Sequence, residues 1–138
     1  MLSRERKPRV LMAVSDRAAE RMSRVLAGWE VVTAASLPQF VHALRCSEFD
    51  LVIVGCHFDG SRALEAVKSV MAHCARVPLA CVLAAPFSSQ LGEGTVAAFH
   101  AAAEELGVDC FIDVLQFPDD EAGNARVHAM LERLLFVT

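Results

Sequence analysis

With 138 residues, the chain is long enough to bury one hydrophobic core but not two. Apolar residues make up 54% of it, which argues against an intrinsically disordered chain. The formal net charge of −4 argues against broad nucleic-acid binding, because that binding depends on neutralising phosphates.

The sequence also bears on the compartment. No window approaches ~20 uninterrupted apolar residues, so no membrane-spanning helix is predicted. Residues 1–9 are polar and lack the apolar core of a signal peptide. The cysteines are odd in number and none are spaced as C-x-x-C, which favours buried, reduced thiols. They are Cys46, Cys56, Cys74, Cys81 and Cys110. A cytoplasmic protein is therefore expected.

Strands and helices are predicted to alternate five times. The expected strands are residues 10–14, 29–34, 50–55, 78–84 and 110–115. Apolar residues recur at helical spacing between them, and after the last strand. The residues that mark these helices are Ala18, Met22, Val25 and Leu26; Leu37, Phe40, Val41 and Leu44; Leu64, Val67, Val70, Met71 and Cys74; Val96, Phe99, Ala103 and Leu106; and Val127, Met130, Leu131, Leu134 and Leu135. Such alternation predicts a doubly wound, five-stranded parallel α/β sandwich of the flavodoxin-like type.

Capping and turn residues predict where the helices begin and end. Asp16 is expected to cap the first helix and Ser61 the third. Gly28 and Gly107 are expected just past the ends of the first and fourth helices. Residues 86–94, which include two glycines, are expected to form an irregular loop.

Four local patterns resemble the receiver domains of response regulators. They are Pro8-Arg9-Val10-Leu11, Trp29-Glu30-Val31-Val32-Thr33-Ala34, the run from Asp50 to Gly60, and Gly107-Val108-Asp109-Cys110-Phe111-Ile112. They occur in the family's order and at nearly its spacing. The pattern of elements leaves residues 1–8 as a flexible tail, and the resemblance implies one receiver-like domain at residues 9–138.

In that family, two acids after the first strand hold Mg²⁺ and an aspartate ending the third accepts a phosphoryl group. A hydroxyl follows the fourth strand and a lysine follows the fifth. The corresponding positions here are Ser15 and Asp16, Gly55, Ala84, and Gln116 or Val114. The resemblance therefore implies a degenerate, non-enzymatic receiver that works without phosphorylation and without a metal or cofactor. Phe111 occupies the position of the family's switch aromatic.

Other residues leave alternatives open. Cys56, His57 and Asp59 lie where an active-site loop is expected, so a small-molecule binder or an enzyme using the strand-end crevice, with Ser15 and Asp16, is the competing hypothesis. A metal site shared with His73 and Cys74 is not expected, because the third helix separates the pairs. Three arginines share a face of the first helix and favour a solvated surface over a site for an acidic partner. They are Arg17, Arg21 and Arg24.

The fourth helix carries the expected interaction surface. Opposite its apolar stripe lie small and acidic residues, namely Ala97, Ala98, Ala101, Glu104 and Glu105. A helix exposed on a soluble monomer normally shows more charge than this. The resemblance implies the same region, from the fourth helix to the fifth. The expected partner is a signalling protein or a second copy of the chain forming a dimer, not nucleic acid or a membrane.

Overall fold

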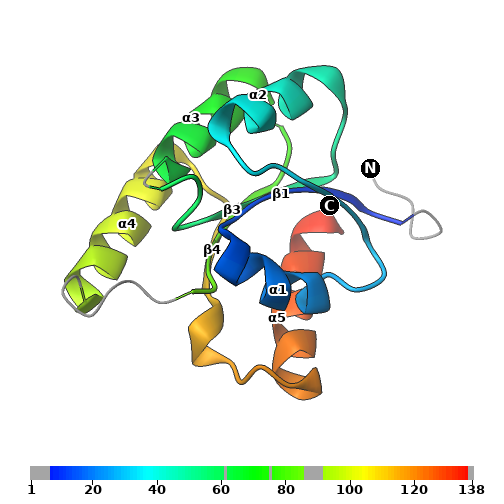
Figure 1. The fold of residues 1–138 in the computed structure, drawn as a ribbon, viewed down its shortest axis with the longest axis vertical. Coiled ribbons are helices and arrows are strands. Elements are labelled where there is room, and N and C mark those ends of the chain that lie inside the picture. Colours follow the sequence, from blue (N-terminus) through cyan, green and yellow to red (C-terminus); the bar gives the residue numbers. More distant parts are fainter. Residues whose placement is uncertain (1–6, 61, 75, 86–91, 137–138) are drawn as a thin grey trace.

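The computed structural model describes residues 7–60, 62–74, 76–85 and 92–136 (Figure 1). Its sheet has five parallel strands in the order β2-β1-β3-β4-β5. The strands are β1 (Arg9–Ala13), β2 (Glu30–Thr33), β3 (Leu51–Gly55), β4 (Leu79–Leu83) and β5 (Cys110–Asp113). The helices are α1 (Asp16–Val25), α2 (Leu37–Cys46), α3 (Ala63–His73), α4 (Gly92–Leu106) and α5 (Glu121–Leu135). The predicted fold class is confirmed.

Helices cover both faces of the sheet. Helices α1 and α5 lie on one face, and α2, α3 and α4 lie on the other (Figure 1). Every residue of β3 and β4 is buried, because alternate side chains enter the two helical layers. The run of apolar residues in β3, without polar alternation, thus identified a strand buried on both faces.

The first helix begins one residue earlier than predicted. Ser15, not Asp16, is its N-cap: Ser15 has extended backbone angles and its hydroxyl accepts a hydrogen bond from the Ala18 amide at 3.4 Å. Asp16 is the first helical residue, where its carboxylate interacts favourably with the positive end of the helix dipole. For α3, the N-cap is Arg62, without a side-chain bond, and Ser61 lies outside the described residues.

The ends of the first four strands differ from the prediction by one residue at most, and two other boundaries differ by more. The fifth strand ends at Asp113 instead of Leu115, because the Asp113 carboxylate accepts from the Leu115 amide at 3.1 Å and starts a 3-10 turn, η1 (Val114–Gln116). Helix α4 begins at Gly92, inside the expected loop, so residues 92–94 are helical. A glycine costs a helix about 1 kcal/mol, and fifteen residues of continuous helix tolerate that cost.

The start of the described chain is tied to the sheet. Pro8 is buried, and its carbonyl accepts a hydrogen bond from the Glu30 amide at 3.0 Å. The Arg9 amide donates to the Asp50 carboxylate at 2.8 Å, which joins the beginnings of β1 and β3. No helix in the described part of the chain is long and apolar enough to cross a membrane.

The predicted solvated arginine face on α1 is wrong for Arg21. This residue is only 8% exposed, and its side chain points into the junction of α1 with α5. Its guanidinium donates to the carbonyls of Val114, Phe117 and Pro118 at 2.8–3.0 Å, and its Nε donates to the Asn124 side chain at 3.0 Å. Arg21 thereby holds the connection from β5 to α5 against α1. Arg17 is exposed, as predicted.

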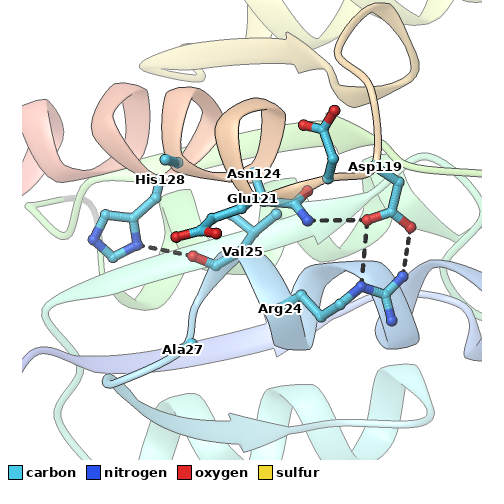
Figure 2. A pocket seen from close by; sticks show the side chains of 9 residues that line it. Arg24, Val25, Ala27, Asp119, Glu121, Asn124 and His128 are labelled. Carbon is cyan, nitrogen blue, oxygen red and sulfur yellow. Dashed lines mark hydrogen bonds and ion pairs between the residues drawn. The ribbon is translucent and has the colours of Figure 1, made fainter.

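The outer edge of the same junction is an ion-pair cluster around a cavity of about 660 Å³ (Figure 2). Arg24 pairs with Asp119, and the Asn124 amide donates to Asp119 at 2.9 Å. Bonding to Arg24, and then to Asn124, lowers the pKa of Asp119. On the other side of the cavity, the His128 ring bonds to the Val25 carbonyl at 2.8 Å and packs on Trp29. These contacts anchor α5 to α1.

We expect Arg21→Met to lower the free energy of unfolding by about 2–4 kcal/mol, because it leaves buried carbonyls without a donor. The matched control is Arg17→Met on the exposed side of the same helix, for which we expect a change below about 0.5 kcal/mol. Urea denaturation of both variants measures the difference. Equal stabilities would show that the Arg21 contacts contribute little.

Candidate functional site: the carboxyl end of the sheet

The strand ends place the predicted site positions along one edge of the sheet. Gly55 is the last residue of β3, and Ala84 directly follows β4. Ser15 lies two residues after β1, and Val114 directly follows β5. Because all five strands are parallel, these positions lie together at the carboxyl end of the sheet, where ligands bind in open α/β sheets.

The space beside Gly55 is filled. A Cβ atom placed on Gly55 would lie 2.8 Å from Cγ1 of Val14, 3.1 Å from its Cβ and 3.2 Å from its Cα. The last of these is backbone, so rotation of the Val14 side chain cannot remove the crowding. Val14 itself is 8% exposed and belongs to the core under α1. Its packing thus occupies the place from which a side chain at position 55 would start.

The polar groups after β1 offer one carboxylate. The Ser15 hydroxyl is used as the helix cap, and Asp16 is exposed in the first turn of α1. A Mg²⁺ ion is normally held through one or two carboxylates together with substrate oxygens. In the part of the chain that the structure describes, no three His, Cys, Asp or Glu side chains form a group that could hold a metal ion.

Of the three candidates after β3, Cys56 is buried, and His57 and Asp59 bond to different segments of the chain. The His57 ring bonds through Nε2 to the Ala85 carbonyl at 2.9 Å. Asp59 has a left-handed backbone (φ 46°), and its carboxylate accepts from the Leu37 amide at 2.9 Å. Leu37 is the first residue of α2, so Asp59 stabilises a helix terminus. The loop joins β3, β4 and α2 through these bonds.

Burial makes the Cys56 thiol a poor nucleophile. Desolvation, and then the nearby Cys81 and Asp113, raise the pKa of Cys56 from its ordinary 9.0 to about 12. The reactive form of cysteine is the thiolate, which this environment disfavours at neutral pH. Burial of Cys56 thus works against a nucleophilic cysteine at this position.

Asp113 is the charged group at the strand ends that the sequence did not single out. It lies at the end of β5 in register with Leu83 of β4, and it is partly buried. Its carboxylate accepts from the Leu115 amide and, at 3.3 Å, from the Gln116 side chain. Val114, the next residue, is fully buried, whereas Gln116 is exposed and turned towards Asp113. This strand end thus carries an acid, without a cation on β5 or η1.

The aromatic Phe111 of β5 is held by α4. The His100 ring stacks on it with centroids 4.3 Å apart and an interplanar angle of 13°, and Phe99 packs on it at 6.1 Å. His100 also bonds to Glu104 at 2.7 Å. Phe111 is thus fixed by neighbours on α4.

The outer face of α4 has the exposure that its periodicity predicted. All five expected surface residues, Ala97, Ala98, Ala101, Glu104 and Glu105, are exposed. On the inner side, Ala103 is buried, and Val96, Phe99 and Leu106 are half-buried. In the β5–α5 connection next along the chain, the large apolar side chain of Leu115 is 42% exposed.

No protein-family model matches the chain, and no curated protein matches it. Its structure is similar to a response regulator from Thermotoga maritima at a TM-score of 0.70 and 16% identity, covering 96% of this chain and 100% of that one. It is also similar to the receiver domain of a sensor histidine kinase from Pseudomonas aeruginosa, at a TM-score of 0.65 and 16% identity, covering 96% of this chain and 100% of that one. That structure has magnesium coordinated in its active-site cleft.

A third similar structure is full-length FixJ from B. japonicum, at a TM-score of 0.69 and 25% identity, covering 94% of this chain and 58% of FixJ. The sequence identities are low, but each alignment covers nearly all of this chain. These similarities show that the described part of the chain adopts the receiver fold.

A side chain added at position 55 tests whether Val14 occupies the space beside it. We expect Gly55→Ala to destabilise the protein by about 1–3 kcal/mol, because the new methyl group overpacks the strand end. Val14→Ala should recover part of this loss in the double variant, since it removes the closest atom. Chemical denaturation of the four proteins in a double-mutant cycle measures the coupling. Strictly additive effects would mean that the two positions do not compete for space.

The buried thiol predicts a loss of stability in alkali. Because the pKa of Cys56 is raised from 9.0 to about 12 in the folded protein, the unfolded state loses this proton first. The contribution of the Cys56 thiol to the free energy of unfolding is complete below pH 9 and declines as the pH rises towards 12. We expect the urea midpoint to fall more steeply above pH 9 in the parent protein than in Cys56→Ala. Equal pH slopes would contradict the assignment.

Proposed function

We propose that this chain is a signalling module with a receiver fold that acts through protein–protein contact and without phosphorylation. The observation that carries the proposal is the packing of Val14 against Gly55 at the strand end where receiver domains carry the phosphoacceptor. Glycine offers no oxygen to phosphorylate, and its neighbour fills the adjacent space.

Electrostatics support the same proposal. A phosphoryl group on this edge would add charge beside Asp113, and neither β5 nor η1 supplies a cation to balance it. Catalysis of phosphoryl transfer depends on such stabilisation of charge by metals and cations. Ala84 and Ala85, both buried, offer no hydroxyl after β4.

The aromatic contacts support a fixed output face. In a phosphorylation switch, the ligand must favour one of two arrangements by differential contacts. Here, stacking with His100 holds Phe111 in place, and no hydroxyl at position 84 is available to change its environment. We infer that the face from α4 to α5 is presented constantly, for a protein partner or a second copy.

The α4 surface suits close packing against another helix. Ala97, Ala98 and Ala101 are exposed and small, so a facing backbone can approach closely, with Glu104 and Glu105 at one end. Leu115 adds an exposed apolar side chain in the adjoining connection. The carboxylates at the end of the patch favour a partner with a basic rim.

The absence of phosphorylation is tested by intact mass after incubation with acetyl phosphate and Mg²⁺. We expect the mass to remain that of the unmodified chain, because position 55 has no acceptor. One hydroxylamine-sensitive phosphoryl group per molecule would overturn the proposal. A receiver domain with an intact acceptor aspartate serves as the positive control.

The contact surface is tested by Ala101→Arg. This substitution should change the free energy of unfolding by less than about 0.5 kcal/mol, since residue 101 is exposed. It should weaken association about tenfold or more, because an interface helix would then bury an unpaired charge. Light scattering across concentration measures self-association, and titration measures the affinity for any identified partner.

The matched control for that test is Ala72→Arg, at an exposed alanine on α3. It adds the same charge outside the proposed surface and should leave association unchanged. If parent and Ala101→Arg are both monomers throughout, and partner affinity is also unaffected, α4 is not the contact surface.

A further inference from the structure

A second cavity lies at the amino end of the sheet, opposite the strand ends described above. Its volume is about 790 Å³, within the range of cavities that hold small organic molecules. It is bounded by the ends of α2 and α3 and by the segments that lead into β3 and β4. None of its lining residues belongs to the carboxyl-end site.

The floor of the cavity is apolar. Leu44 and Val52 are buried there, and Phe49 and Val77 are half-buried. The Arg9 guanidinium lies 5.1 Å from the centre of the Phe49 ring and donates to the Glu48 carbonyl at 3.3 Å, which fixes this segment. An apolar body can therefore bury surface against a floor whose ring is already held in place.

The rim of the cavity carries exposed basic side chains. Arg45, His73 and Arg76 line it and are exposed, and no described side chain pairs with any of them. Glu48 is also exposed there. Asp50, by contrast, is engaged by the Arg9 amide. Two guanidinium groups and two carboxylates thus line the cavity, and one of the carboxylates, that of Asp50, is already bonded to the Arg9 amide.

The helix dipole accounts for only part of this arrangement. Arg45 and His73 lie in the last turns of α2 and α3, where a cation interacts favourably with the terminal carbonyls. Arg76 lies beyond the end of α3, so that explanation does not cover it. Its position on the rim adds a second guanidinium to the same cavity.

We propose that this cavity binds a small organic carboxylate. The apolar body of the ligand packs on Phe49 and Val77, and its carboxylate pairs with Arg45 and Arg76 at the rim. Guanidinium groups match carboxylates in geometry and form charge-assisted hydrogen bonds with them. The site is independent of the proposed signalling contact, because none of the residues that line it belongs to α4.

Benzoate is the probe, and benzylamine is its control of similar shape and opposite charge. We expect benzoate to shift the amide resonances of residues 44–50, 73, 74, 76 and 77 saturably, with an affinity in the range of about 1 mM, and benzylamine to leave them unshifted. Equal shifts with both compounds, or none with benzoate at about 10 mM, would overturn the proposal.

Variants separate charge recognition from apolar contact alone. Arg45→Gln combined with Arg76→Gln should weaken benzoate binding about tenfold. Glu48→Gln should strengthen it about twofold, because it removes a repelling carboxylate at an exposed position. Arg17→Gln, an exposed arginine on α1, is the matched control and should change nothing. Unchanged affinity in the double arginine variant, with the rest of the amide spectrum intact, would also overturn the proposal.

Discussion

The constraint on which the rest of the structure depends is the burial of the central strands on both faces. Every residue of β3 and β4 is buried, as is every residue of β1 except Arg9, so these strands consist almost wholly of apolar side chains. Polar side chains are thereby excluded from the middle of these strands, and they lie at the ends of the sheet, in the connections and on the outer faces of the helices. What the molecule can bind therefore depends on the ends of the sheet and on the outer faces of the helices.

At the carboxyl end of the sheet, the side chains pack against one another or form hydrogen bonds with nearby backbone groups. Val14 fills the space beside Gly55, Ser15 caps α1, and Asp59 satisfies the first amide of α2. The Arg21 guanidinium donates hydrogen bonds to the backbone carbonyls of the segment that leads into α5. The arrangement stabilises the fold, and it supports our proposal that the module signals through a constant surface instead of a phosphorylation switch.

Periodicity predicted the fold because it reports on burial, and burial defines the layers. It could not predict that Arg21 is buried, since the carbonyls that satisfy its guanidinium come from residues far along the chain. Asp113 was overlooked within an expected apolar strand that the aspartate itself ends by starting η1. The start of α4 was missed because glycine normally favours loops, and the crowding between Val14 and Gly55 appears only when β1 and β3 are placed side by side.

The most direct measurement is the amide spectrum of the labelled protein with Mg²⁺, recorded before and after beryllofluoride is added. Beryllofluoride mimics a phosphoryl group on an acceptor carboxylate, so a working receiver responds along the strand ends and at its switch aromatic. We expect the resonances of Gly55, Ala84 and Phe111 to remain unchanged. Saturable shifts of these three signals, absent with Mg²⁺ or fluoride alone, would contradict phosphorylation-independent action.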